Sequence, residues 1–227
     1  MKNGFFRLCA GTFSLVAIVF AVGCGGSGGT TSLRVVQASP DTGQVSVLVN
    51  GTTVNSDLGY AGNTGYLSVN AGSPTLQVIP LNSTTPIVNQ TLDLGSGTET
   101  TVIVANYKAN IDGLVLTDDN TDPAVGDIEL RVVNASPGIG SADVYMVPSG
   151  SSLTTIAPII TSLGFESASS YQTLTAGTYQ VFLTAPGTKN AYVSTSQLTL
   201  TSGQIRTIVA LNGATGGYTS LTLADLN

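Results

Sequence analysis

The octapeptide Leu33–Pro40 (LRVVQASP) occurs a second time in the 227-residue chain, as Leu130–Pro137 (LRVVNASP). Seven of the eight positions are identical. Such a close internal match is typical of a chain built from consecutive copies of one structural unit. The sequence therefore predicts two tandem domains, each of which opens with this segment.

Further matches follow the octapeptide in the same order in both halves. We therefore expect a first domain at residues 33–120, an acidic linker at 121–128 and a second domain at 129–227. The matching pairs are Leu58-Gly59-Tyr60 with Leu163-Gly164-Phe165, Tyr66 with Tyr171, Ala71-Gly72 with Ala176-Gly177, and Leu114–Asp118 with Leu221–Asp225.

Each half has the pattern of an all-β domain. Val45–Val49 is a short apolar run, and the Asn50-Gly51 pair that follows it is a strong signal for a two-residue hairpin turn. Many short strands separated by turn residues favour two tandem antiparallel Ig-like β-sandwich domains, with a small barrel as the alternative. Further strands are expected at 76–79, 100–104, 114–116, 142–147, 178–183, 205–211 and 219–223.

The N-terminal segment has the features of an export signal. Lys2 and Arg7 precede an uncharged, mostly apolar stretch from Leu8 to Val22, which is short for a membrane span. Residues 21–24 (AVGC) resemble the lipobox of bacterial lipoproteins, although Ala21 stands where leucine is usual. The resemblance implies a signal peptide at 1–23 and a lipidated Cys24, followed by a flexible Gly/Ser tether within 24–32.

The cysteine count agrees with lipidation, because Cys9 lies in the signal and Cys24 would be the only cysteine of the mature protein. The lipoprotein resemblance implies that Cys24 carries two acyl chains on its sulfur and one on its amine, which is more than stable membrane anchoring needs. We expect an exported protein that is attached to the membrane by this anchor. Gly25 lacks the Asp-type inner-membrane retention signal, which favours the outer membrane.

The repeated Arg-Val-Val-x-Ala-Ser-Pro opening resembles the domain of unknown function 4397 family (DUF4397). Supporting positions are Ser39-Pro40-Asp41, the Asn50-Gly51 turn and Leu116–Asn120. Where histidine is common in that family, this chain has Gln37 and Asn134. The resemblance covers both halves and implies an exported or surface-attached bacterial protein, without implying an activity.

Composition excludes several classes of function. The chain has no histidine, so Ser-His-Asp and Cys-His relays and imidazole metal sites are impossible. Seven basic against thirteen acidic residues give a net charge of −6, which makes a nucleic acid an unsuitable partner. A hydrolase without histidine needs two carboxylates in one pocket, and the sequence places no such pair. We expect no catalytic activity.

The acidic join between the halves suggests a calcium site. Counted from Asp118, oxygen ligands occupy the first, third, fifth and twelfth positions of a calcium loop, as Asp118, Asn120, Asp122 and Glu129. Pro123 occupies the sixth position, where such a loop needs a glycine with positive φ. The alternatives are a looser calcium site between the domains and a solvated acidic linker.

Two sets of repeated residues have a structural and a functional interpretation. Arg34 and Arg131 are predicted to be outward-facing or paired with carboxylates, rather than anion ligands. Tyr60 with Phe165, and Tyr66 with Tyr171, are predicted to fill the sandwich cores, with a binding platform as the alternative. The sequence thus favours a non-catalytic, lipid-anchored envelope protein with a structural, adhesive or binding role. A glycan- or peptide-binding module of an envelope complex is the alternative.

Overall fold

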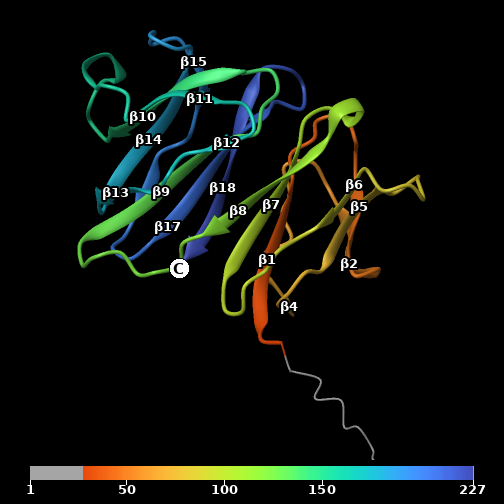
Figure 1. Cartoon of the computed structure of the whole chain (residues 1–227). Coiled ribbons are helices and arrows are strands. Elements are labelled where there is room, and N and C mark those ends of the chain that lie inside the picture. The colour runs from red at the N-terminus through yellow and green to blue at the C-terminus, as the bar shows by residue number, and fades with distance from the viewer. Residues whose placement is uncertain (1–27, 227) are drawn as a thin grey trace, which may run out of the picture.

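The computed structural model describes residues 28–226, and they form four β-sheets in two sandwiches (Figure 1). The predicted signal peptide, Cys24 and the start of the tether lie outside the described residues. Between residues 28 and 226, no helix is long and apolar enough to cross a membrane.

The first sandwich contains β1–β8. One sheet has the order β4 (Leu67–Asn70), β1 (Thr30–Gln37), β7 (Glu99–Ala105), β8 (Asp112–Asp118). The other sheet has the order β3 (Thr52–Leu58), β2 (Val45–Val49), β5 (Thr75–Pro80), β6 (Val88–Thr91). A short 3₁₀ turn, η1 (Lys108–Asn110), connects β7 to β8.

The second sandwich repeats this arrangement with β9–β18. One sheet has the order β12 (Ser167–Ala168), β9 (Asp127–Asn134), β17 (Ile205–Asn212), β18 (Tyr218–Leu226), and β13 (Gln172–Thr175) also pairs with β9. The other has the order β11 (Ile160–Gly164), β10 (Ser141–Pro148), β14 (Gly177–Thr184), β15 (Ala191–Ser194), and β16 (Leu198–Leu200) also pairs with β14. A second 3₁₀ turn, η2 (Leu153–Thr155), lies between β10 and β11.

The all-β sandwich predicted from the sequence is confirmed, and the open sheets exclude the barrel alternative. The Asn50-Gly51 turn also forms as predicted. Both residues have positive φ, of 49° and 76°, and Val49 pairs directly with Thr52. Positive φ at both central residues is what the tight turn between two twisted strands requires.

Two strand pairs differ from the expected antiparallel pattern. β1 pairs with β7, and β9 with β17, in parallel. After β1 the chain crosses to the other sheet, builds β2, and later returns as β7, and such a crossover is what parallel neighbours need. Short strands and turn residues predict hairpins between consecutive strands, and they do not predict that β7 comes back to pair beside β1.

The element boundaries also differ from the expectation at both ends of the first half. β1 begins at Thr30, so residues 30–32, which were expected in the tether, pair with β4. β9 begins at Asp127, so Asp127 and Ile128 belong to a strand and not to the linker. Ile128 is fully buried, which explains why it is held in the sheet.

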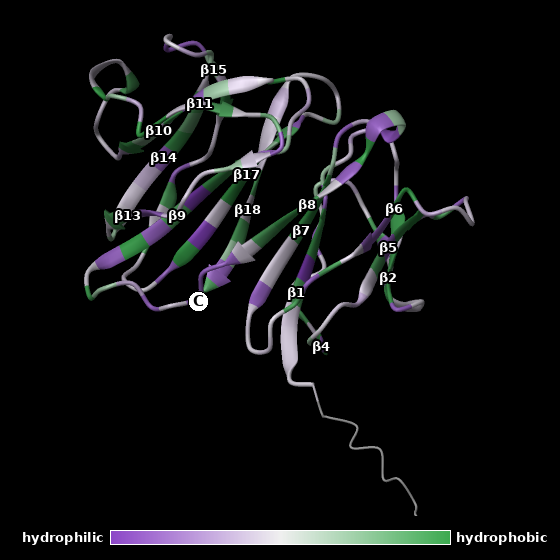
Figure 2. Ribbon diagram, viewed as in Figure 1, coloured by the Kyte–Doolittle hydropathy of each residue, from purple (hydrophilic) through white to green (hydrophobic). Residues whose placement is uncertain are grey.

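Each sandwich encloses its own hydrophobic core, and a third core lies between the sandwiches. The third core joins the outer face of the β1–β7–β8 sheet to that of the β9–β17–β18 sheet. In Figure 2, hydrophobic residues cover much of β9 and β17, with hydrophilic residues between them. The buried members of the third core are Val36, Ala38, Ile103, Ala105, Val133, Ala135, Val209, Leu211 and Leu223.

Candidate functional site: a buried charge network between the sandwiches

Four charged side chains meet where the two sandwiches face each other. Arg34 lies on β1, Arg131 on β9, Asp118 at the end of β8 and Asp225 on β18. Each of the four residues is at most 6% exposed. We refer to these four residues as the charge network.

The shortest ion pairs of the charge network cross from one sandwich to the other. Arg34 Nη2 lies 2.5 Å from Asp225 Oδ1, and Arg131 Nη2 lies 2.5 Å from Asp118 Oδ1. The pairs within each half are longer, at 3.4 Å for Arg34–Asp118 and 3.9 Å for Arg131–Asp225. Two positive and two negative side chains make the buried group electrically neutral.

Hydrogen bonds hold both arginines in this position. The Nε atoms of Arg34 and Arg131 donate to Thr101 Oγ1 and Thr207 Oγ1, each at 2.9 Å. The Nη1 atoms donate across the interface, from Arg34 to the Ala224 carbonyl at 2.8 Å and from Arg131 to the Thr117 carbonyl at 3.1 Å. Every contact on one side has a counterpart on the other.

A tyrosine covers each arginine. The guanidinium carbon of Arg34 lies 4.4 Å from the centre of the Tyr66 ring, and that of Arg131 lies 4.6 Å from the centre of the Tyr171 ring. The Tyr66 hydroxyl donates to Asp118 at 2.7 Å, and the Tyr171 hydroxyl donates to Asp225 at 2.9 Å. Burial, followed by the nearby carboxylates, raises the pKa of both tyrosines above its ordinary value.

The expectation that Tyr66 and Tyr171 fill the sandwich cores is therefore wrong. Neither belongs to the core cluster of its own sandwich. The guanidinium face attracts the ring because a cation is stabilised over an aromatic face. Tyr60 packs against the third core, between the sandwiches, and its counterpart Phe165 is half-buried.

A second set of contacts joins the sandwiches around Asn212. The Tyr60 hydroxyl donates to the Asn212 carbonyl at 2.5 Å, and Asn212 Nδ2 donates to Tyr107 Oη at 3.0 Å. Ser136 Oγ donates to Asn212 Oδ1 within the second sandwich. Burial and the neighbouring Tyr107 raise the pKa of Tyr60 to about 12.

The structure gives Asp118 partners that a calcium ligand does not have. Both of its carboxylate oxygens accept hydrogen bonds, from Arg131, Arg34, Thr101 and Tyr66. Asn120 and Asp122 lie exposed in the connection after β8, and Glu129 lies on β9. Across residues 28–226 no three Cys, Asp or Glu side chains are grouped so that they could hold a metal ion.

The charge network binds parts of the protein to each other and leaves no group free for chemistry. General acid–base catalysis needs a group that reaches the substrate. Asp118 and Asp225 are 6% and 5% exposed, and arginines and hydroxyls occupy their oxygens. What the arrangement does is hold two sheets together.

Sequence reasoning identified each member of the charge network but missed their convergence. The arginines, the aspartates and the covering tyrosines all occupy matching positions in the two halves. The joint repetition of an arginine, an aspartate and a tyrosine was the signal that could have pointed to a shared site. Strand patterning does not show which faces of two sandwiches meet, so it did not predict the interface.

Comparison with known families gives one match. The family described as domain of unknown function (DUF4397) matches residues 31–145, which run from β1 to the middle of β10. The matched region contains Arg34, Asp118 and Arg131 of the charge network. No curated protein sequence matches the chain.

Several solved structures are similar at low scores. The Bacillus anthracis TIE protein is 11% identical with a TM-score of 0.27, over 84% of this chain and 34% of that one, so this chain spans about a third of its length. A family CBM26 module of Eubacterium rectale Amy13K, solved with maltoheptaose, is 11% identical with a TM-score of 0.25, over 86% and 95%. Streptococcal family 41 carbohydrate-binding modules are 12% identical with a TM-score of 0.28, over 84% and 96%.

These three similarities are too weak to assign a ligand to this chain. The family match, by contrast, extends over half of the sequence. It also begins within β1, one residue after the start of that strand. The chain belongs to the DUF4397 family.

Proposed function

We propose that this protein is a non-catalytic, lipid-anchored protein of the bacterial cell envelope, in which two β-sandwiches act as one rigid body. Its role is structural, adhesive or binding: it holds a defined surface at a fixed place on the membrane. The observation that carries the proposal is the charge network buried between the sandwiches.

Rigidity follows from the energetics of such a network. Separating the sandwiches exposes the third core and leaves each arginine without the carboxylate that lies 2.5 Å away. Exposing the apolar side chains of the third core to water costs about 25 cal/mol per Å², and the ion pairs and carbonyl hydrogen bonds across the interface fix one relative position of the two sandwiches. The network therefore opposes any hinge motion between the two halves.

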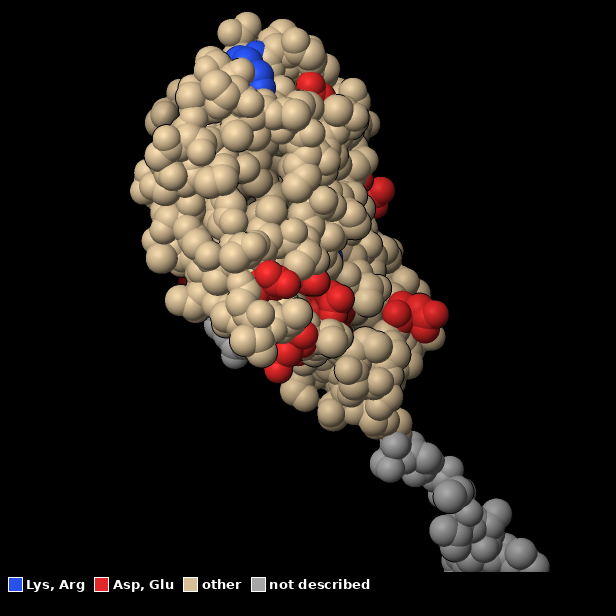
Figure 3. All heavy atoms as spheres, turned by 90° about the vertical axis from the view of Figure 1, so that its left-hand side faces the viewer, with Lys and Arg blue, Asp and Glu red and all other residues tan. Residues whose placement is uncertain are grey.

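The anchor is supported by the sequence alone. The apolar leader and Cys24 resemble a lipoprotein signal, and the anchor would lie close to Thr30, where β1 begins. The short segment between Cys24 and β1 would keep the folded body near the membrane, and Gly25, which lacks the Asp-type retention signal, favours the outer membrane. The face in Figure 3 is mostly uncharged, with acidic groups gathered in its lower part, which makes nucleic acid an unsuitable partner.

Labelling with a clickable fatty acid tests the anchor. Bacteria expressing the full chain are expected to incorporate the label and to retain the protein in the membrane fraction. The Cys24→Ala variant should lose the label and leave the membrane, while Cys9→Ala, the matched control, should keep both. An unlabelled full-length protein in the soluble fraction would refute the anchor.

A further inference from the structure

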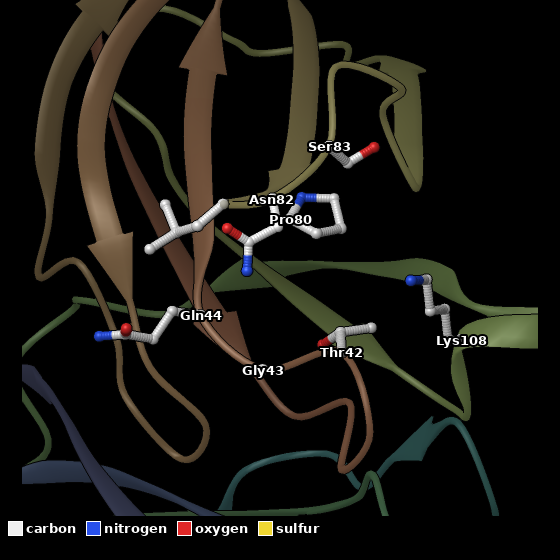
Figure 4. Close-up of a pocket in the computed structure, with 8 residues that line it drawn as sticks. Thr42, Gly43, Gln44, Pro80, Asn82, Ser83 and Lys108 are labelled. Atoms are coloured by element: carbon white, nitrogen blue, oxygen red, sulfur yellow. The ribbon is translucent and has the colours of Figure 1, made fainter.

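A hollow of about 250 Å³ lies at one end of the first sandwich (Figure 4). Three segments surround it: the turn before β2, the turn after β5 and the start of η1. The side chains that matter below are Thr42, Gln44, Leu81, Asn82, Ser83 and Lys108.

Hydrogen bonds fix the three segments relative to each other. Leu81 N donates to the Gln44 carbonyl at 3.1 Å, which ties the turn after β5 to the start of β2. Lys108 N donates to Asp41 Oδ1 at 2.8 Å, which ties η1 to the turn before β2. The hydrogen bonds therefore hold the three segments that line the hollow in fixed positions relative to each other.

The lining combines hydroxyls, amides and one ammonium group. Asn82 supplies a side-chain amide, the hydroxyls of Thr42 and Ser83 already donate to backbone carbonyls and so offer acceptor lone pairs, and the exposed side chain of Leu81 supplies an apolar wall. A few polar groups beside an apolar surface are typical of sites for small ligands. The volume is slightly below the usual range for such sites, roughly 300–1,000 Å³, and suits one ring-sized unit.

The ammonium group of Lys108 is in none of the ion pairs that the structure gives for residues 28–226. The nearby Asp41 carboxylate accepts a hydrogen bond from the backbone N of Lys108. Lys189, in the turn between β14 and β15 at the corresponding end of the second sandwich, is used internally. Its Nζ lies 3.9 Å from the centre of the Tyr145 ring and donates to the Ile156 carbonyl.

The two halves differ in how they use the lysine at this end of the sandwich. Both sandwiches fold with the same strand order, but only the first leaves a lysine unpaired beside a hollow. A lysine ammonium is a compact charge that pairs well with a carboxylate. The chain has a net charge of −6 and few charged residues, and Lys108 is the cation that lines this hollow.

We propose that the hollow binds the carboxylated sugar unit of an acidic glycan, a hexuronate. The carboxylate pairs with Lys108, the ring hydroxyls donate to Thr42 Oγ1 and Ser83 Oγ and bond to the Asn82 amide, and the C–H face of the ring rests on Leu81. This inference adds a ligand to the rigid envelope protein proposed above and rests on that proposal for its biological setting. A shallow site with a single cation gives weak binding, with a Kd on the order of millimolar.

The test is an NMR titration of the full chain, purified in detergent, with D-glucuronate, D-glucose and inorganic phosphate as separate probes. Glucuronate should give saturable shifts of the backbone amides of Thr42, Ser83 and Lys108. Glucose should bind at least tenfold more weakly, because it lacks the carboxylate. Raising the salt concentration should weaken glucuronate binding, since the interaction depends on charge.

Two lysine variants make the result specific to the hollow. Lys108→Gln should weaken glucuronate binding at least tenfold, and Lys189→Gln, the matched control, should leave it unchanged. Lys108 is exposed, so its variant is expected to keep the wild-type amide spectrum outside the hollow. No saturable shift, equal binding of phosphate or glucose, or an unaffected Lys108→Gln variant would each overturn the inference. None of these outcomes bears on fatty-acid labelling, so the two proposals fail independently.

Discussion

Asp118 shows how strongly one side chain can depend on its tertiary surroundings. In the sequence it is the first of several acidic residues and has the appearance of a solvated or metal-binding group. In the structure its side chain is fully buried, with Arg131 at 2.5 Å and Arg34 at 3.4 Å. Burial of a charge is tolerated only when the charge is paired and hydrogen-bonded, and both conditions hold for Asp118.

Replacing Asp118 with asparagine should therefore be strongly destabilising. The Asp118→Asn variant keeps the shape of the side chain but leaves two arginines facing a single carboxylate, which makes the buried group net positive. We expect a loss of about 3–5 kcal/mol in the free energy of unfolding, measured by urea denaturation.

Asp93→Asn is the matched control, because Asp93 is exposed on the first sandwich. A surface change of this kind should alter stability by no more than about 0.5 kcal/mol. An Asp118→Asn variant as stable as Asp93→Asn would contradict the importance of the charge network.

The tyrosines around the interface predict the behaviour at alkaline pH. The pKa of Tyr60 is raised to about 12, and those of Tyr66 and Tyr171 are also raised. The folded state then holds these phenolic protons more tightly than the unfolded chain, whose tyrosines ionise near pH 10. Their contribution to stability is fully present below pH 10 and is lost as the pH rises through the folded-state values.

Absorbance at 295 nm and thermal melting between pH 9 and pH 12 measure this effect. We expect stability to fall steadily above pH 10, and the Tyr66→Phe/Tyr171→Phe variant to show a shallower fall. The double variant loses two hydrogen bonds to carboxylates, so its stability at pH 8 should also be lower. A wild-type stability that rises above pH 10 is incompatible with the raised pKa values.

At the scale of elements, strands β1, β7, β9 and β17 are buried on both faces. On β1, the neighbouring residues Val35 and Val36 point to opposite faces, and both are fully buried. Val35 belongs to the core of the first sandwich, and Val36 belongs to the third core. Such continuous apolar runs are typical of strands that are covered on both sides.

The connection between β8 and β9 predicts the response to calcium. Asp118 is engaged with arginines, and the remaining predicted ligands Asn120, Asp122 and Glu129 are not grouped with it. Because a calcium loop needs six or more oxygen ligands around one point, we expect no change in melting temperature on adding millimolar calcium.

A melting curve with and without calcium, followed by EDTA, checks this expectation. A rise in melting temperature that Asp122→Asn abolishes would restore the calcium hypothesis. The Asp57→Asn variant, at an exposed position on β3, controls for the general effect of removing one negative charge.

At the scale of the whole molecule, the two sandwiches are related by an approximate twofold arrangement of contacts. Arg34 pairs with Asp225 as Arg131 pairs with Asp118, and each arginine bonds a carbonyl of the opposite sandwich. Each half therefore supplies one cation and one anion to the interface. This is the self-complementary pattern of a symmetric dimer, here built within one chain.

Coupling of this kind predicts cooperative unfolding. We expect a single calorimetric transition, with the calorimetric and van't Hoff enthalpies equal within error. In the Asp118→Asn/Asp225→Asn variant the interface loses both anions, and the transition should separate into two. Two resolved transitions in the wild-type protein would show that the halves are thermodynamically independent.

The sequence by itself determined the strands and the tight turn, because these depend on local physics. Alternating and apolar runs specify strands, and the Asn50-Gly51 pair specifies a turn through its positive φ values. Repetition of the octapeptide likewise indicated two similar halves, and the structure gives both the same strand order. These features need only residues that are close together in the chain.

Only the tertiary structure decided what the repeated charged residues do. Arg34 and Asp225 are separated by 191 positions, and their contact depends on how two finished sandwiches pack. The parallel pairing of β1 with β7 depends in the same way on a return of the chain from the other sheet. Local patterning carries no information on such distant contacts, because the faces that meet are chosen by the fit and charge of whole surfaces.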